Sequence, residues 1–200
     1  GSWVAQLLRQ GSGSNLIAVG NTRFYRSTDF GLTWATSDLD ASFSSTFSNG
    51  RIAVAPGNSN VVYTAWVNNT FSNANNASIY YSTDGGVTFT KKYAFSNALT
   101  LLSYDGSPGT GYGWANFFLT VSKTDPNTLY TGGHIIFKST DNGASWVEAT
   151  SNWYCCIHTD IHHLIYDPNN AGRFLASTDG GVFLSTDDAA NWTPLSNGLS

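Results

Sequence analysis

The residues of this chain best suited to chemistry lie together at positions 155–163, in the order Cys-Cys-Ile-His-Thr-Asp-Ile-His-His. In an extended strand the side chains alternate between two faces, so His158, Asp160 and His162 are predicted to lie on one side. Two imidazoles beside a carboxylate can bind a metal ion or share a proton. We favour a hydrogen-bonded ladder that holds an inner strand in place, with a metal site and a catalytic group as the alternatives.

Cys155 and Cys156 are the two cysteines of the chain, and they are adjacent. Neighbouring cysteines cannot link distant strands to each other. A vicinal disulfide formed in an oxidising compartment and a pair of free thiols are both open interpretations.

Three long stretches lack a clear strand pattern and carry aromatic residues: 67–76, 95–115 and 149–157. Loops longer than about 12 residues usually have a function or are disordered. Aromatic rings there could stack on sugar rings or contact another protein. Together with His158, Asp160 and His162, the predicted binding residues are Tyr104, Tyr112, Trp114 and Trp153.

The elements that position these residues are set by a motif that occurs four times, Ser-Thr-Asp followed five residues later by Trp or Phe. Its aspartates are Asp29, Asp84, Asp141 and Asp187, at intervals of 46–57 residues. Four matching turns cannot all be one active site, so we interpret these aspartates as structural. The carboxylate is expected to accept backbone N–H groups, a glycine to supply the positive φ, and the aromatic ring to pack between sheets. The fourth copy has Ala189 instead of glycine, which predicts the least regular turn.

Three further short strands precede each motif. Hairpin pairs such as Gly132-Gly133 separate two of these strands, and a turn closed by proline follows the first strand in three of the repeats. A four-stranded antiparallel unit repeated at this period is a propeller blade. The sequence therefore predicts an all-β propeller segment over 1–200, with blades near 1–38, 41–94, 115–150 and 157–200. Because an open ring would expose strand edges, the blades are expected to belong to a larger ring or to be completed by a partner chain.

The motif Ser-x-Asp-x-Gly-x-Thr-Trp resembles the Asp-box, also called the BNR repeat, of sialidases, sortilin-type ectodomains and xyloglucanase-type glycoside hydrolases. The resemblance covers nearly the whole chain and implies a β-propeller, a fold that carries many activities. His158-x-Asp160-x-His162 followed by Asp179-Gly180-Gly181-Val182 is also similar to the last blades of secreted bacterial Asp-box proteins. The resemblance thus implies a secreted or cell-surface protein of a bacterium.

Composition narrows the range of partners. A formal charge of -4, with 11% charged residues, argues against nucleic acid. No apolar run approaches the roughly 18 residues that a membrane helix needs, so membrane insertion is not expected. Aromatic residues make up 14% of the chain, which is typical of an all-β extracellular protein. The expected partner is a glycan or a surface protein, and no cofactor is expected.

Two functions remain open. A carbohydrate- or protein-binding module is favoured, because no complete catalytic constellation is visible and the single glutamate, Glu148, with five arginines fits a sialidase poorly. The alternative is a xyloglucanase-like glycoside hydrolase of which this chain is a part. Such an enzyme uses two carboxylates, about 6.5–9.5 Å apart if it inverts configuration. Asp160 and Asp179 are the catalytic candidates in that case.

Overall fold

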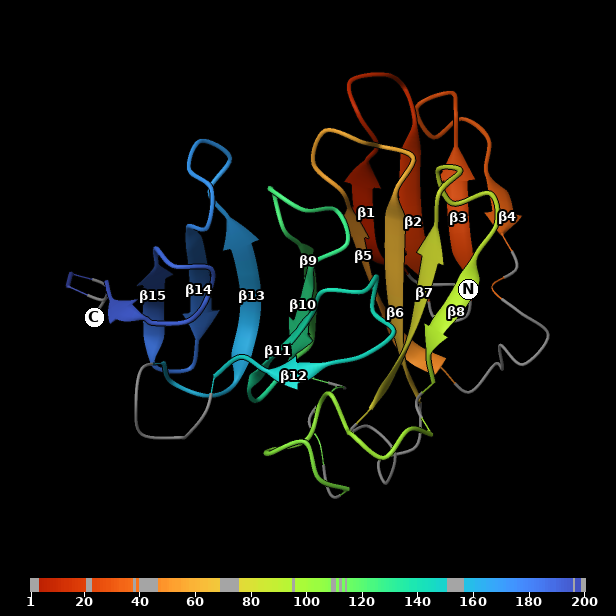
Figure 1. The fold of residues 1–200 in the computed structure, drawn as a ribbon. Helices are drawn as coiled ribbons and strands as arrows, with labels where there is room; N and C mark the ends of the chain where they lie inside the picture. The colour runs from red at the N-terminus through yellow and green to blue at the C-terminus, as the bar shows by residue number, and fades with distance from the viewer. Residues whose placement is uncertain are drawn as a thin grey trace.

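Among the residues that it describes, the computed structural model has sixteen β-strands in four sheets (Figure 1). Each sheet has four antiparallel strands paired in chain order, which confirms the predicted all-β propeller segment. We call the sheets blades 1 to 4. No helix among the described residues is long and apolar enough to cross a membrane. The described residues are 4–20, 23–37, 39, 47–68, 76–94, 96–108, 111, 113, 115–150, 157–195 and 197–198.

The strands of each blade follow the same order from the inner to the outer edge. Blade 1 contains β1 (Val4–Arg9), β2 (Leu16–Gly20), β3 (Phe24–Ser27) and β4 (Ala35–Ser37). Blade 2 contains β5 (Phe47–Val54), β6 (Val62–Asn68), β7 (Ala77–Ser82) and β8 (Thr90–Tyr93). Blade 3 contains β9 (Phe118–Val121), β10 (Leu129–Gly132), β11 (Ile136–Ser139) and β12 (Val147–Glu148). Blade 4 contains β13 (Ile161–Tyr166), β14 (Phe174–Thr178), β15 (Gly181–Ser185) and β16 (Thr193–Pro194).

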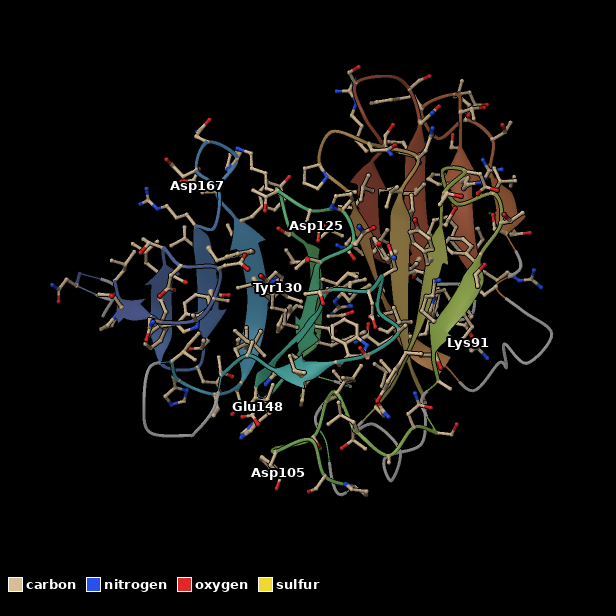
Figure 2. All side chains as sticks on the ribbon, in the orientation of Figure 1. Lys91, Asp105, Asp125, Tyr130, Glu148 and Asp167 are labelled. Carbon is tan, nitrogen blue, oxygen red and sulfur yellow. The ribbon has the colours of Figure 1, made fainter. Side chains whose placement is uncertain are left out.

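The blades follow one another in an arc around their inner strands (Figure 1). Strand β1 contacts β5, β5 contacts β9, and β9 contacts β13. The two ends of the blades can be told apart in Figure 2, where Asp125 and Asp167 lie at one end and Asp105 lies at the other. We call the end with Asp125 and Asp167 the box face, because the third box contacts the turn beside Asp125 through Tyr63. The opposite end, with Asp105, is the loop face.

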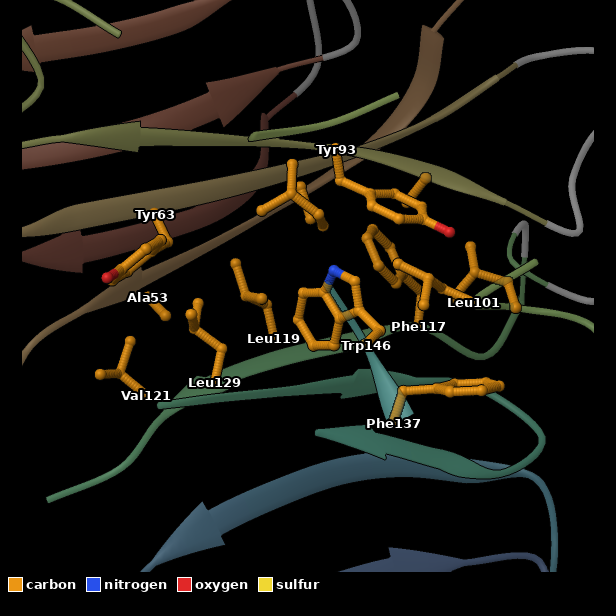
Figure 3. Close-up of a cluster of buried hydrophobic side chains, with 14 of the residues drawn as sticks. Ala53, Tyr63, Tyr93, Leu101, Phe117, Leu119, Val121, Leu129, Phe137 and Trp146 are labelled. Atoms are coloured by element: carbon orange, nitrogen blue, oxygen red, sulfur yellow. The ribbon is translucent and has the colours of Figure 1, made fainter. Parts of the chain in front are cut away.

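Three apolar clusters hold the arc together, one between each pair of neighbouring blades. Figure 3 shows the cluster between blades 2 and 3, where Tyr63 of β6 faces Leu119, Leu129 and Trp146 of blade 3. Since a middle blade is covered on both faces, its central strands are apolar on both sides, as β10 illustrates with four buried residues in succession. Face-to-face packing of twisted sheets is therefore the main source of stability here.

The second box shows how its aspartate holds the turn. Oδ1 of Asp84 accepts the backbone N–H groups of Val87 and Thr88, at 3.0 and 2.9 Å, and Oδ2 accepts the Thr88 hydroxyl at 2.6 Å. The Ser82 hydroxyl donates to Asp84 at 2.7 Å and accepts the Gly86 N–H at 2.9 Å. Around Asp29, Asp141 and Asp187 the serine bonds and the N–H bond from the residue four positions later recur, and a side-chain donor of that residue again reaches Oδ2. The box carboxylates thus stabilise the turns and have a structural role.

The fourth turn is as regular as the others, so the prediction of a less regular turn was wrong. Ala189 adopts φ +70°, close to the +90°, +84° and +83° of the glycines at this position in the other three boxes. Its N–H donates to the Ser185 hydroxyl at 3.0 Å, and the Asn191 amide donates to Asp187 at 2.7 Å in place of a hydroxyl. The hydrogen bonds outweigh the cost of about 1–2 kcal/mol that a side chain in this conformation carries.

The box carboxylates should make stability depend on acid. Hydrogen bonds from the Thr33 hydroxyl, the Thr33 N–H and the Ser27 hydroxyl lower the pKa of Asp29 to about 2. A lowered pKa in the folded state gives stability that is present above the unfolded value, about 3.9, and is lost as the pH falls through the folded value. We expect the free energy of unfolding, measured by urea titration, to fall between about pH 4 and pH 2.

The variant Asp29→Asn serves as the control for this prediction. It has no carboxylate at position 29 that could take up a proton in this window, so its stability should fall less over the same pH range. An equal fall in both proteins would show that the Asp29 box does not contribute.

Candidate functional site

Several titratable side chains gather on the loop face where blades 3 and 4 meet. At their centre is Asp160, whose Oδ1 accepts the Asn116 amide at 3.1 Å and lies 3.1 Å from Nδ1 of His134. The His134 side chain is only 4% exposed, whereas that of Asp160 is 25% exposed. The ring of Tyr104 meets the His134 ring edge-on, with 4.3 Å between their centroids. His134 therefore connects Asp160 to Tyr104 of the loop at 96–108.

Backbone contacts fix the position of Asp160. Its N–H donates to the His134 carbonyl and its own carbonyl accepts the Asp179 N–H, each at 3.3 Å. Thus Asp160 lies between the β10–β11 and β14–β15 hairpins. Gly133 lets the β10–β11 hairpin lie close to Asn116, because a Cβ there would come within 2.2 Å of the Asn116 carbonyl oxygen. Asp160 itself has φ +60°, a conformation that aspartate tolerates better than most residues.

A second pair of charged groups lies beside this centre and is open to water. Nε2 of His162 and Oδ1 of Asp179 are 2.6 Å apart, with side chains 42% and 55% exposed. His162 occupies a β-bulge, since the pairing of β13 with β14 shifts between Ile161 and His163. The bulge turns His162 toward the β14–β15 hairpin.

The three residues predicted to share one strand face do not do so. Strand β13 begins only at Ile161, Asp160 has a positive φ, and His162 is displaced by the bulge. His158 instead lies over Gly180, where a Cβ would come within 2.4 Å of its ring, and its Nδ1 lies 2.8 Å from the Thr159 carbonyl oxygen. Strand alternation could not apply to a segment that is not a strand.

In place of a ladder, the loop face holds two separate carboxylate–imidazole pairs. Asp160 pairs with a buried histidine and Asp179 with an exposed one. Within the part of the chain that is described, no group of three His, Cys, Asp or Glu side chains is arranged to hold a metal ion. Sequence analysis missed His134, although the preceding Gly132-Gly133 pair signals a close backbone approach.

Five predicted residues lie outside the described part of the chain, and their roles stay predictions. They are Tyr112, Trp114, Trp153, Cys155 and Cys156.

A cavity of about 430 Å³ lies along the axis and is lined by the inner strands of all four blades. Its most buried cation is Arg51, whose pKa is lowered by burial. The Arg51 side chain donates to the Phe117 carbonyl at 2.7 Å and to the Asn49 side chain at 2.6 Å, and it lies over the Phe117 ring. These contacts hold β5 against blade 3. Arg51 is therefore engaged in packing the inner strands.

Residues 80–91, in the second box, match the BNR/Asp-box repeat family. This match, the four boxes and the four four-stranded sheets identify the chain as a BNR-type β-propeller. Its sequence is 31% identical over 144 residues to a xyloglucanase of Hypocrea jecorina (strain QM6a), which covers 63% of this chain and 16% of that protein.

Solved structures show the same fold. The GH74 enzyme of Niastella koreensis has a TM-score of 0.70 at 21% identity, covering 98% of this chain and 30% of that one. YCF48 from Cyanidioschyzon merolae has a TM-score of 0.59 at 15% identity, covering 96% of this chain and 56% of that one. The chain thus has the propeller fold of these structures, and it spans only a small part of the xyloglucanase it matches.

The two aspartates should differ in their effect on stability. Asp160→Ala removes the acceptor of the Asn116 amide and the partner of buried His134, which should cost about 1–3 kcal/mol of unfolding free energy. Asp179→Ala removes only an exposed pair, so its effect should stay within about 0.5 kcal/mol. Urea unfolding of both variants beside the parent chain measures this difference. Equal effects would refute the distinction between a structural and an accessible carboxylate.

Proposed function

We propose that this chain is part of a carbohydrate-binding propeller whose loop face contacts the glycan. The observation that carries the proposal is the accessible His162–Asp179 pair beside the Tyr104–His134–Asp160 cluster. Sugars are bound by polar groups that exchange hydrogen bonds with hydroxyls, together with aromatic rings that cover the apolar sugar face. The loop face offers both kinds of group.

Two further features support the loop face as the binding surface. The box face is formed by turns whose carboxylates are already saturated with internal donors. On the loop face, by contrast, the Asp179 side chain is more than half exposed and is bonded to an exposed histidine. The loop at 96–108 is anchored there through Asn76, which is bonded to the backbone at positions 97, 99 and 101. A rigid support of this kind lowers the entropic cost of binding.

The similarity to a xyloglucanase over 144 residues makes xyloglucan the first glycan to test. Since polysaccharides of this kind lie outside cells, the proposal includes a secreted or cell-surface location for this chain.

Binding should depend on the loop face and not on the box face. We expect Asp179→Ala and Tyr104→Ala each to weaken binding of xyloglucan oligosaccharides by about tenfold, which corresponds to roughly 1.4 kcal/mol per interaction. Isothermal titration calorimetry measures the affinity.

Matched controls lie at the other end of the blades. Asp188 is also an aspartate in an ion pair, with Lys138, and Phe30 is an aromatic residue that is 68% exposed in the first box. Asp188→Ala and Phe30→Ala should bind like the parent chain. If the loop-face and box-face variants bind equally well, the assignment of the surface is wrong.

A glycoside hydrolase is the second candidate. It is favoured by the same xyloglucanase similarity and by the backbone hydrogen bond that places Asp179 beside Asp160. An inverting enzyme places one carboxyl group as acid and another as base on opposite sides of the bond that breaks. Asp160, however, is engaged by Asn116 and His134 at the same time. Because these bonds hold the Asp160 carboxylate, it is less suited to act as acid or base, which favours binding over hydrolysis.

We therefore expect the chain to bind xyloglucan without cleaving it. The release of reducing ends over many hours, compared with a heat-denatured sample, measures cleavage. Turnover that disappears in Asp160→Ala or Asp179→Ala, while binding persists, would establish the hydrolase instead.

A further inference from the structure

The exposed pair on the loop face offers a ligand hydrogen-bond acceptors. Nε2 of His162 lies 2.6 Å from Oδ1 of Asp179. Because an ionised carboxylate only accepts hydrogen bonds, the proton between these two atoms is carried by Nε2, and Nδ1 of the neutral imidazole is then an acceptor. Within the described part of the chain, no donor is bonded to Nδ1 of His162 or to Oδ2 of Asp179. The two atoms left for a ligand therefore both accept.

Other carboxylates lie on the same face as this pair. Asp160 is joined to Asp179 by a backbone hydrogen bond of 3.3 Å, and its side chain is partly open to water. Asp105 is an exposed residue of the loop at 96–108, and Figure 2 shows Glu148 toward the same end of the blades as Asp105. These groups add negative charge to the face that Asp179 shares.

The lysines and arginines of blades 3 and 4, by contrast, reach toward the box face. Their contacts are Lys138 with the Asp188 carboxylate at 2.5 Å, Arg173 with the Asp167 carboxylate at 3.6 Å, and Lys123 with the Pro168 carbonyl. Each of these partners lies in the fourth box or in the turn at Asp167. Among the described residues of blades 3 and 4, the loop face therefore has carboxylates and histidines but no lysine or arginine to balance them.

We propose that the His162–Asp179 pair selects glycans whose contacting groups donate hydrogen bonds, so that the loop face takes neutral and amino sugars and rejects acidic ones. This inference rests on the proposed glycan binding and names the class of glycan. A sugar hydroxyl can donate to Nδ1 or to the Asp179 carboxylate, and an ammonium group only donates. The carboxylate of an acidic sugar only accepts, so it would meet acceptors and a charge of its own sign. Asp179 is then the residue that determines specificity.

Three β-1,4-glucan oligosaccharides of equal length test this selectivity, because they differ only at carbon 6, which carries a hydroxyl, an amino group or a carboxylate. Calorimetric titration at about pH 8, above the range in which histidines usually gain a proton, gives the three affinities. The carboxylate form should bind at least about tenfold more weakly than the hydroxyl form, which corresponds to about 1.4 kcal/mol. The amino form should bind at least as tightly as the hydroxyl form. In about 1 M salt, where the Debye length is about 3 Å, the differences should shrink.

The variant Asp179→Asn separates selectivity from damage to the site. Its amide keeps an oxygen for the His162 N–H, but it loses the charge and gains a donor. The affinity for the carboxylate form should therefore rise and that for the amino form should fall, each by roughly threefold, as expected for an exposed charge pair. Damage to the site would lower both affinities. Asp188→Asn removes a carboxylate of the box face, so it is the matched control and should leave the three affinities unchanged.

Two outcomes would overturn the selectivity while leaving glycan binding intact. One is equal affinity of the parent chain for the carboxylate and hydroxyl forms. The other is an Asp179→Asn variant whose affinities for the carboxylate and amino forms change in the same direction. If none of the three oligosaccharides binds to the parent chain, the proposed glycan binding fails and the selectivity fails with it.

Discussion

The hydrogen bonds made by the box aspartate are the interaction on which the rest of this propeller depends. One carboxylate accepts four backbone and hydroxyl donors within a single turn, as Asp84 and Asp141 show. Charge-assisted bonds of this type are short and directional, so the turn has one conformation. That conformation directs the aromatic residue of the box out of its own sheet and onto the sheet before it. Local hydrogen bonding is in this way converted into the packing between blades.

A second constraint acts at the opposite end of the blades, where the two hairpins of blades 3 and 4 are joined through Asp160. Here the contact is made by backbone groups and by a buried histidine. The consequence is that His162 and Asp179 are held on a rigid support although they are open to water. Function on a propeller is commonly built from loops on a scaffold that stays fixed.

The stability of the arc comes from the sheet faces that neighbouring blades cover. Middle blades bury both sides of their sheets, whereas the first and last blades each leave one apolar side exposed, as Trp34 and Ile165 show. Both sides of a blade are needed because each sheet contributes to two interfaces.

The sequence by itself determined the fold. The four boxes show where each blade repeats, and the short strands and turns around each box give the order of the strands within a blade. The role of the box aspartates could be derived in the same way, since repetition excludes a single active site and the donors lie within five residues. The sequence could not determine the arrangement of His158, Asp160 and His162. Their geometry depends on a positive φ at Asp160 and a bulge at His162, and both arise from contacts with hairpins that lie about 20 residues or more away in the chain.

Likewise, only the tertiary structure paired Asp160 with His134 and Asp179 with His162, and only it left Trp34 uncovered while burying Trp146. Identical motifs have identical local bonds, but their exposure depends on what lies against them.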